Sequence, residues 1–435
     1  MTPRVLLQIL VIYGILHGHS ITTSADIGNV FYVLGTDGIY VIDPVAKSVV
    51  ANITDKTAPG LCTKRSGSSD ICSFGLACAV HETVFVADRS GRAVHLIDIK
   101  TYKKIKTIQT DSSPFEMLCM PWRKEVWVSL SSGGFDVIDT EHRTSTRVAH
   151  AQLPNDDRDR ILADQNMLKG KTGFVTTLKD SGIHELNLET KDYTRFRNFS
   201  RYGCSGTYGQ SIVYNSYNKQ VYVRCKINEN ATLALDTLSG ATKKWFISGY
   251  PFVSPNGRYV MITDAINRID ILTVNKTGFK ASHTKLAIPG AVSNPVFYRK
   301  GNSSVSYYVF FSLDHADKMM VVDLDLAKNA GNISAVKYIE GVNSFFGRFY
   351  NLFINDKWII YVVDADNTVV IINAETQKIH GKIKGVNGGH WAVWVSRPSA
   401  SATSEPTMTT TNGNSGVGRP SCFTFLVFLH VFIQL

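Results

Sequence analysis

Several patterns that are typical of common enzyme and metal-binding classes are absent from the sequence. It contains no C-x-x-C pair and no G-x-S-x-G turn. The first absence argues against a zinc site, and the second argues against the nucleophile turn of an α/β-hydrolase. The chain also lacks a nucleic-acid-binding module and the acidic runs that would mark direct contact with mineral. These absences leave few catalytic classes open.

The composition is that of a protein with a sizeable core. The chain has 435 residues, of which 44% are hydrophobic and 11% aromatic, enough for one large domain or two to three ordinary ones. The net charge is +10, and the basic residues are scattered, with short groups at 102–106, 195–202 and 243–244. This scatter favours a solvated surface over a single patch for acidic glycans or anionic lipid.

The N-terminal segment has the layout of a secretory signal peptide. Arg4 is followed by an apolar run from Val5 to Leu16, which is too short to span a bilayer, and small residues follow it. We therefore predict a signal peptide over residues 1–24, with cleavage within 20–25. The predicted folded region extends from 26 to 396.

The C-terminal segment has the layout of a lipid-attachment signal. Its last 13 residues, Phe423–Leu435, are almost all apolar, and small residues precede a short spacer before them. This pattern predicts a glycosylphosphatidylinositol (GPI) anchor at Asn414, with Asn412 as the other acceptor and 415–435 removed. A retained tail anchor or single span, and no anchor at all, are the alternatives. Residues 397–414 are rich in Ser, Thr and Pro and are predicted to form a disordered stalk.

Secretion makes two further features credible. Six N-x-[ST] sequons predict N-glycosylation on surface loops: Asn52, Asn198, Asn230, Asn275, Asn302 and Asn332. Seven cysteines occur, and one of them, Cys422, lies in the predicted propeptide. The remaining even number in an oxidising compartment predicts disulfides.

The positions of the cysteines suggest particular pairs. We expect Cys204 to bond to Cys225, because YGQSIVY and QVYVRC form a hairpin around NSYNK. Cys62 and Cys72 are expected to close a local loop. The sequence leaves the state of Cys78 and Cys119 open, and two unpaired buried thiols are our expectation.

One pattern recurs along the middle of the chain. It consists of an apolar strand, a polar turn, a second strand ending near Asp or Asn, a short turn and a third strand. Eight copies occur at intervals of about 40–50 residues, the period of a β-propeller. They start at Val30, Thr83, Glu125, Gly173, Gln220, Arg258, Tyr307 and Trp358. The second strand is regularly followed by D-x-x-[ST] or a variant, which suits a tight turn because short polar side chains bond their own backbone.

A fourth strand lies between successive copies, which gives four strands per blade. The first copy has no preceding strand, whereas GGHWAVWV near the end of the repeats has no partner. We therefore predict that residues 389–395 complete the first blade and close the ring, because closure removes exposed sheet edges. Eight blades are favoured. Seven is the alternative, because the inner strand DRILADQNML at 159–168 is poorly marked.

The second half of the chain resembles the C-terminal propeller region of the follistatin-related proteins. The residues that carry the likeness are YGCSGTYGQS, QVYVRCK, DTLSG, SPNGRYVM and IKGVNGGHWAVWV. More generally it is similar to YVTN-type repeat propellers of cell surfaces. The resemblance implies a scaffold and little chemistry. The follistatin/Kazal, EF-hand and immunoglobulin-like modules of that family have no counterpart before Val30, so their binding functions are not carried over.

The predicted inner strands carry few ionisable residues. Glu116 is the main carboxylate among them, and His390 and Arg348 are the other candidates. One acid does not make a site for a hard cation, so we predict no metal, no cofactor and no catalytic residues. The histidines fall singly on strands and loops and are expected to be packed or exposed. The aromatic residues Trp127, Tyr222 and Trp245 are expected to pack between blades.

The prediction from sequence is therefore a lipid-anchored extracellular binding module. Its partner would be a protein or glycan at the cell surface or in the matrix, and nucleic acid is excluded by the predicted compartment. A structural component of a secreted or skeletal matrix is the first alternative. A propeller hydrolase with a channel site is the second.

Overall fold

The computed structural model describes most of the chain between Asn29 and Ser396. The described residues are 29–63, 71–148, 159–177, 180–226, 231–247, 249–263, 268–276, 283–288, 290, 292, 295–301, 305–313, 316–327, 335–342, 352–355, 357–363 and 366–396. The predicted signal peptide, stalk and lipid-attachment segment lie outside these ranges.

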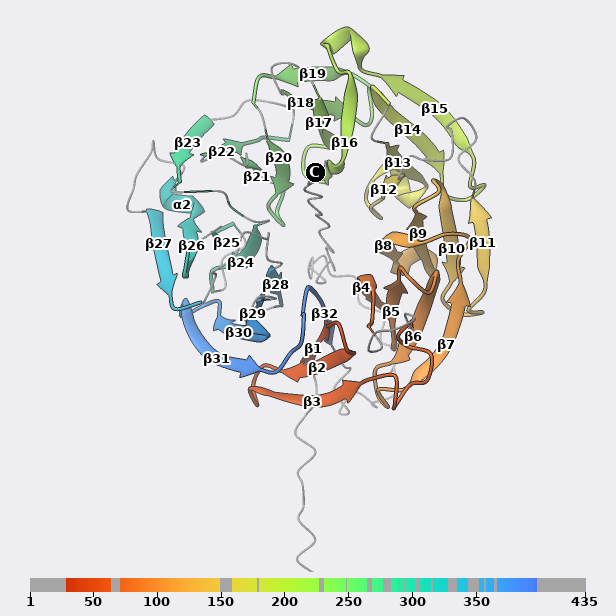
Figure 1. The fold of residues 1–435 in the computed structure, drawn as a ribbon. Coiled ribbons are helices and arrows are strands. Elements are labelled where there is room, and N and C mark those ends of the chain that lie inside the picture. The colour runs from red at the N-terminus through yellow and green to blue at the C-terminus, as the bar shows by residue number, and fades with distance from the viewer. Residues whose placement is uncertain are drawn as a thin grey trace, which may run out of the picture.

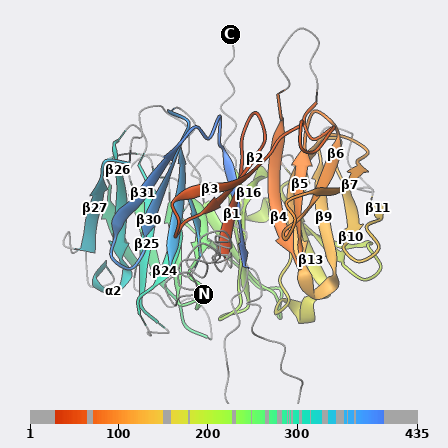
Figure 2. The same cartoon turned by 90° about the horizontal axis from the view of Figure 1, so that it is seen from below.

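The described residues form a β-propeller of eight four-stranded antiparallel sheets (Figure 1). Figure 2 shows the same ring from its edge, with the blades standing side by side. The first strands of neighbouring blades, such as β4 and β8, contact each other around the centre. The predicted fold class and the favoured number of blades are confirmed.

The first four blades, numbered in chain order, contain these strands. Blade 1 has β1 (Asn29–Leu34), β2 (Ile39–Asp43), β3 (Ser48–Ile53) and β32 (Trp391–Ser396). Blade 2 has β4 (Phe74–Val80), β5 (Thr83–Asp88), β6 (Ala93–Asp98) and β7 (Lys104–Gln109). Blade 3 has β8 (Pro114–Met120), β9 (Glu125–Leu130), β10 (Phe135–Asp139) and β11 (Ser145–Val148). Blade 4 has β12 (Arg160–Leu162), β13 (Thr172–Thr176), β14 (Gly182–Asn187) and β15 (Tyr193–Asn198).

The second half of the ring repeats this arrangement. Blade 5 has β16 (Gly206–Asn215), β17 (Gln220–Lys226), β18 (Ala231–Asp236) and β19 (Thr242–Trp245). Blade 6 has β20 (Tyr250–Val253), β21 (Tyr259–Thr263), β22 (Arg268–Thr273) and β23 (His283–Ala287). Blade 7 has β24 (Val296–Arg299), β25 (Tyr307–Ser312), β26 (Lys318–Asp323) and β27 (Val336–Glu340). Blade 8 has β28 (Leu352–Ile354), β29 (Trp358–Val363), β30 (Thr368–Asn373) and β31 (Lys378–Lys384).

Helical segments in the described residues are short and lie on connections. They are η1 (Pro121–Arg123), η2 (Leu168–Gly170), η3 (Ser200–Tyr202) and α2 (Leu324–Ala327). In the part of the chain that the structure describes, no helix combines the length and the apolar character needed to cross a membrane.

The hydrophobic core is divided among the boundaries between blades. Buried apolar residues of the described ranges form eight clusters, one for each pair of neighbouring blades. Trp127 lies in the cluster between blades 3 and 4, and Tyr222 packs on Trp245 between blades 5 and 6 with ring centroids 5.5 Å apart. The inter-blade packing that we expected for these aromatic residues is confirmed. It explains why the second strands are almost continuously apolar, since both of their faces are covered.

The turn between the third and fourth strands is built alike in seven of the described blades. An Asp or Asn at the end of the third strand accepts hydrogen bonds from the backbone N–H groups two and three residues later. These residues are Asp43, Asp98, Asp139, Asn187, Asp236, Asp323 and Asn373. The predicted D-x-x-[ST] turns are therefore present, and their side chains replace the backbone partners that a bend in the chain removes.

The same turn places a later residue in the left-handed region. Four positions after the Asp or Asn, φ lies between 55° and 75° in six blades. Only one of these residues is glycine: they are Lys47, Tyr102, Arg143, Lys191, Gly240 and Gln377. A side chain in this conformation is strained, because its Cβ approaches the following carbonyl oxygen.

The ring is closed by strand β32, which is the innermost strand of blade 1. It pairs with β1 over six residue pairs, from Asn29 opposite Ser396 to Leu34 opposite Trp391. Trp391 is 2% exposed, and the ring of Trp394 lies 4.7 Å from that of Phe31. The predicted closure is confirmed, although the strand starts two residues later than expected. The poorly marked inner strand of blade 4 is also present, but it is only three residues long.

We expect the closing strand to be required for stable folding. Replacing Trp391 by Ala should lower the free energy of unfolding by about 3–5 kcal/mol, because the loss of a large buried side chain leaves a cavity. Trp122→Ala is the matched control, since Trp122 is 37% exposed, and it should cost about 1 kcal/mol or less. Urea unfolding of both variants tests this, and equal midpoints would show that β32 adds little to the fold.

The strained turns give a second expectation. Gln377→Gly should raise the free energy of unfolding by roughly 0.5–1 kcal/mol. Glycine removes the strain of the left-handed conformation, and part of this gain is offset because glycine has more conformational entropy in the unfolded chain. Gln377→Ala keeps a Cβ at the same φ and should bring no gain. Gly240→Ala should destabilise, because it places a Cβ at a φ of 75°, where any side chain is strained, and the Arg197 guanidinium would also have to move. Thermal melting of the three variants compares them, and a gain for Gln377→Ala equal to that for glycine would contradict the strain argument.

Candidate functional site

Two ionisable residues of the inner strands form a buried ion pair. Glu116 on β8 forms an ion pair with Arg160 on β12, and each side chain is 7% exposed. The Arg160 guanidinium also lies over the ring of Phe115, 4.9 Å from its centroid. The arginine compensates the charge of the buried carboxylate, so this pair joins blades 3 and 4.

The other two sequence candidates do not converge on Glu116. The ring nitrogens of His390 lie 3.2 Å from the carbonyl oxygen of Gly388 and 3.0 Å from that of Phe74. His390 thus links the closing segment to blade 2. Arg348 lies outside the described residues. Within the described ranges, no group of three or more His, Cys, Asp or Glu residues is placed to hold a metal ion.

In six blades the third strand carries a buried polar side chain close to its N-terminal end. These residues are Tyr40, His95, Asp136, His184, Thr232 and Asp270. Three of them form Asp–His pairs: His95 with Asp88 at 3.5 Å, His184 with Asp180 at 2.6 Å, and His283 with Asp270 at 2.5 Å. These pairs were not predicted, because the histidines were expected to be single packed or exposed residues. A polar residue at the second or third position of six otherwise apolar third strands was the signal available.

The connection between β3 and β4 is long, and it contains a disulfide. Cys62 and Cys72 bond to each other, and both are buried. Oδ1 of Asp55 accepts hydrogen bonds from the backbone N–H groups of Leu61 and Cys62. The loop continues into the core between blades 1 and 2 through Leu61. Loops of this length usually carry function or have structure of their own, and the described parts of this one, 54–63 and 71–73, are held by the disulfide and by hydrogen bonds.

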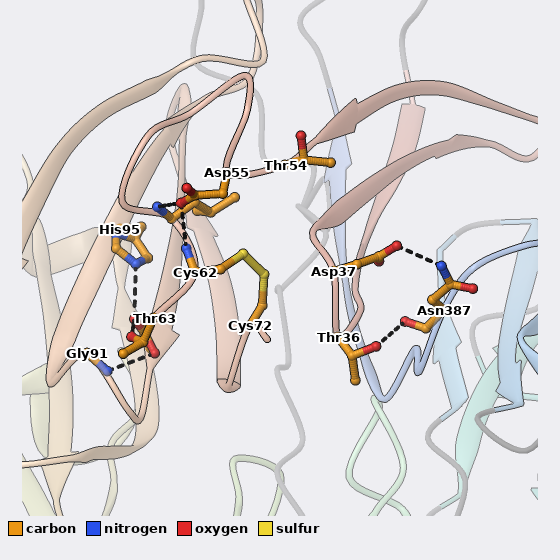
Figure 3. Close-up of a disulfide and its surroundings, with 12 residues drawn as sticks. Thr36, Asp37, Thr54, Asp55, Cys62, Thr63, Cys72, Gly91, His95 and Asn387 are labelled. Atoms are coloured by element: carbon orange, nitrogen blue, oxygen red, sulfur yellow. Dashed lines mark hydrogen bonds and ion pairs between the residues drawn. A yellow bond between two sulfur atoms is a disulfide. The ribbon is translucent and has the colours of Figure 1, made fainter. Parts of the chain in front are cut away.

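This loop meets two other connections at the closure of the ring (Figure 3). The N–H of Cys72 donates to the carbonyl of Thr36 in the β1–β2 hairpin, and the N–H of Thr36 donates to the carbonyl of Asn387. The Asn387 side chain donates to Asp37 at 2.7 Å. We call residues 35–38, 54–63, 71–73 and 385–390 the seam loops. Three segments that are far apart in the sequence therefore form one continuous surface at one end of the ring.

Hydrogen bonds of the Tyr40 hydroxyl hold two of the seam loops together. Burial, together with the hydrogen bond that its hydroxyl donates to Asp37, raises the pKa of Tyr40 to about 12. The same hydroxyl accepts the N–H of Asn387 at 3.2 Å. Tyr40 therefore stays neutral at physiological pH and joins the first hairpin to the closing segment.

A buried carboxylate ties the seam loops to blade 2. Asp88 accepts hydrogen bonds from the Thr63 hydroxyl and the Gly91 N–H, each at 3.0 Å, and faces His95. Burial by itself would raise the pKa of Asp88, but the hydrogen bonds and the positive field of His95 outweigh it, so the pKa is lowered. The charged form of Asp88 is thus favoured in the folded protein.

The cysteines of the folded region form three disulfides. Cys204 bonds to Cys225 within blade 5, as the hairpin around NSYNK predicted, and Cys62 bonds to Cys72. The expectation of unpaired thiols at Cys78 and Cys119 is wrong, because these residues bond to each other. They lie on the neighbouring first strands β4 and β8, whose contact brings the two Cα atoms within 6.2 Å, a separation that a disulfide can span.

Three of the predicted glycosylation sites lie in the described residues. Asn52, Asn198 and Asn275 are all exposed. Asn230, Asn302 and Asn332 lie outside the described residues, and so does the predicted lipid-attachment residue Asn414. Exposure is a requirement for attachment of a glycan, and these three positions meet it.

Comparison with known proteins supports the fold and nothing finer. No family model matches the sequence. Similar solved structures include the dihydro-heme d1 dehydrogenase NirN, with a TM-score of 0.62 and 11% identity over 84% of this chain and 75% of that chain. The apo form of AztD from Citrobacter koseri has a TM-score of 0.58 and 12% identity over 85% of this chain and 98% of that chain.

Hydrazine synthase from Kuenenia stuttgartiensis is a third similar structure. Its TM-score is 0.51, with 14% identity over 72% of this chain and 99% of that chain. At such identities the likeness shows a shared propeller fold and transfers no activity. The resemblance to the follistatin-related proteins stays a prediction.

The Asp88 contacts lead to a pH-dependent expectation. Because its pKa is lowered on folding, the Asp88 carboxylate contributes stability above its unfolded pKa of about 3.9, and this contribution is lost as the pH falls through the folded pKa. Asp88→Asn should therefore lower the free energy of unfolding by about 1–3 kcal/mol at pH 7. The difference from the parent should shrink on acidification below about pH 4.

Urea titrations at pH 7 and pH 3 measure this difference directly. Asp111→Asn is the control, because Asp111 is an exposed carboxylate at the equivalent end of the blade. A constant difference between parent and Asp88→Asn at both pH values would show that the charge of Asp88 does not stabilise the fold.

Proposed function

We propose that this protein is an extracellular binding module, held at the outer face of the plasma membrane by a lipid, that presents the seam loops to a protein or glycan partner. The observation that carries the proposal is the set of three disulfides, one of which joins two blades and one of which fixes the longest seam loop. Structural disulfides form and persist in oxidising compartments.

Two further observations support an outward-facing role. The sequons at Asn52, Asn198 and Asn275 are exposed. The seam loops combine exposed polar groups, such as Thr36 and Asn387, with a backbone fixed by hydrogen bonds. A preorganised loop surface on a rigid scaffold loses little entropy on binding, which suits recognition.

The chemistry of the interior also favours binding over catalysis. The buried acids and histidines described above are paired within or between blades. Such pairs stabilise hairpins, and their positions repeat around the ring instead of converging on one point. A catalytic site requires convergence of unlike groups on a reacting atom.

Treatment of intact cells with a phosphatidylinositol-specific phospholipase tests the anchor. The full-length protein should be released into the medium, shift to lower mass with peptide-N-glycosidase, and show the three disulfides in non-reducing peptide maps. Replacing Asn414, Ser415 and Gly416 together by bulky residues should abolish surface display, because lipid transfer requires small residues at the site.

The control variant carries bulky residues at the predicted stalk positions Ser399 and Ser401, which should leave display and release unchanged. A protein that stays on the membrane after lipase treatment, and is extracted by detergent with Leu435 still present, would exclude the lipid anchor. Retention of free thiols inside the cell would overturn the extracellular assignment itself.

A further inference from the structure

Two basic segments that are separate in the sequence lie side by side on the outer edge of the ring. The segment 195–202 starts on β15 and continues through η3, and residues 243–244 lie on β19; both strands are outermost in their blades (Figure 1). The Tyr202 hydroxyl donates to the carbonyl oxygen of Thr242 at 3.1 Å. These two basic groups, which are separate in the sequence, therefore lie close together in the structure.

The strand register shows that cations from both blades face the same boundary. Arg195 lies opposite Glu185 and Arg197 lies opposite Ile183, which packs in the core between blades 4 and 5. Lys244 lies opposite Leu233, which belongs to the same core cluster. Directly opposite residues of an antiparallel pair share one face of the sheet. Arg195, Arg197 and Lys244 thus converge on the outer end of this boundary.

Arg201 extends this group along the connection between the two blades. We call Arg195, Arg197, Arg201 and Lys244 the basic strip. Arg197 forms an ion pair with Glu185. Within the described residues, no carboxylate lies within ion-pair distance of Arg195, Arg201 or Lys244. From residue 193 to 247 the sequence has eight Lys or Arg residues and two Asp or Glu residues.

Some exposed lysines elsewhere in the ring have carboxylate partners, unlike three of the four cations of the basic strip. Three exposed lysines each form an ion pair with a glutamate: Lys100 with Glu82, Lys124 with Glu141 and Lys171 with Glu189. Pairs of this kind largely cancel the local field. The basic strip therefore keeps a positive potential that these three paired lysines do not produce.

Aromatic rings accompany the cations. The Arg201 guanidinium lies 4.8 Å from the ring centroid of Tyr202, and the Lys244 ammonium lies 4.8 Å from that of Phe246. Phe246 is 75% exposed. A flat exposed ring between cations offers an apolar contact next to charge-assisted hydrogen bonds, and the arginine fork matches planar or tetrahedral oxyanions. Repeating anionic groups on a chain of sugar rings have the complementary chemistry.

The predicted glycan at Asn198 does not cover this surface. Asn198 lies opposite Gly182 and Phe196 lies opposite His184, whereas Arg197, between them, faces the other side of β15. Successive side chains of a strand point to opposite faces. A glycan on Asn198 would therefore extend away from the boundary on which the basic strip lies.

We propose that the basic strip binds a sulfated polysaccharide of the extracellular matrix or cell surface. This rests on the proposed extracellular function, because that compartment supplies the ligand. An anionic membrane is the other polyanionic surface, but the negative surface potential of cells belongs to the cytoplasmic leaflet. The basic strip also lies on the outer edge of the ring, apart from the seam loops, so both surfaces can be occupied together.

Binding of the detergent-purified full-length protein to immobilised heparin, measured at several NaCl concentrations, tests the proposal. The triple variant Arg195→Gln, Arg201→Gln, Lys244→Gln should lose roughly tenfold to a hundredfold in affinity near 0.15 M salt. The slope of log affinity against log salt should fall by about two to three, since each cation that neutralises a polyanion releases about 0.7–0.9 counterion.

The matched control is Lys100→Gln, Lys124→Gln, Lys171→Gln, which removes the same charge from exposed lysines and should leave affinity and slope unchanged. Both variants should melt like the parent; if the strip triple unfolds, Arg195→Gln alone should still weaken heparin binding about threefold. Desulfated heparin should bind much more weakly than heparin.

Three outcomes would overturn the proposal: equal losses in the two triple variants, no binding of the parent to heparin, or strip-dependent binding to phosphatidylserine vesicles in place of heparin. A protein that is displayed and glycosylated but does not bind heparin loses only this inference. A protein that is retained inside the cell with free thiols loses the proposed extracellular function as well.

Discussion

Ring closure is the constraint on which the rest of this structure depends. Each blade buries its apolar faces only against its two neighbours, so the core has no centre of its own and consists of boundaries. Two of those boundaries, between blades 8 and 1 and between blades 1 and 2, require β32 to be in place, because it supplies Ala392 to the first and Trp391 and Val393 to the second. Closure therefore couples the last described strand of the chain to the first.

The same closure creates the seam loops. The β31–β32 connection has to reach blade 1, and there its Asn387 bonds to the first hairpin, whose Thr36 in turn accepts a hydrogen bond from Cys72 of the disulfide-bonded loop. A structural requirement thus places three connections together at one end of the ring. Hydrogen bonds between the described parts of these connections hold their backbones together as a consequence of the fold.

Much of the architecture was predictable because the same local sequence pattern occurs in each copy of the repeat. Eight apolar strand patterns, the turn signals at residues such as Asp43 and Asp236, and the unpartnered GGHWAVWV strand were sufficient to predict eight blades and their closure. The Cys204–Cys225 bond followed from a hairpin, which is a local feature. The Cys78–Cys119 bond was missed because it depends on how closely two neighbouring first strands approach each other, a quantity that no local pattern encodes.

The polar groups were less predictable for the same reason. Glu116 was singled out as the main acid of the inner strands, but its partner Arg160 lies on a strand of three residues in the next blade. The Asp–His pairs join residues from 4 to 13 positions apart, and only the register of the hairpins brings them together. The basic groups at 195–202 and 243–244 likewise became one surface only through the packing of blade 4 on blade 5.

Departures from the repeat indicate where function lies in such a ring. The inter-blade clusters, the Asx turns and the buried polar residues of the third strands recur from blade to blade, and each is explained by the stability of its own blade. The disulfide-bonded loop between β3 and β4 has no counterpart among the other described connections, and the basic strip joins cations of two blades. Neither is needed to build a blade. Surplus charge on one boundary costs stability through self-repulsion. Features that the scaffold does not require, and that carry such a cost, are best explained by what they contact outside the ring.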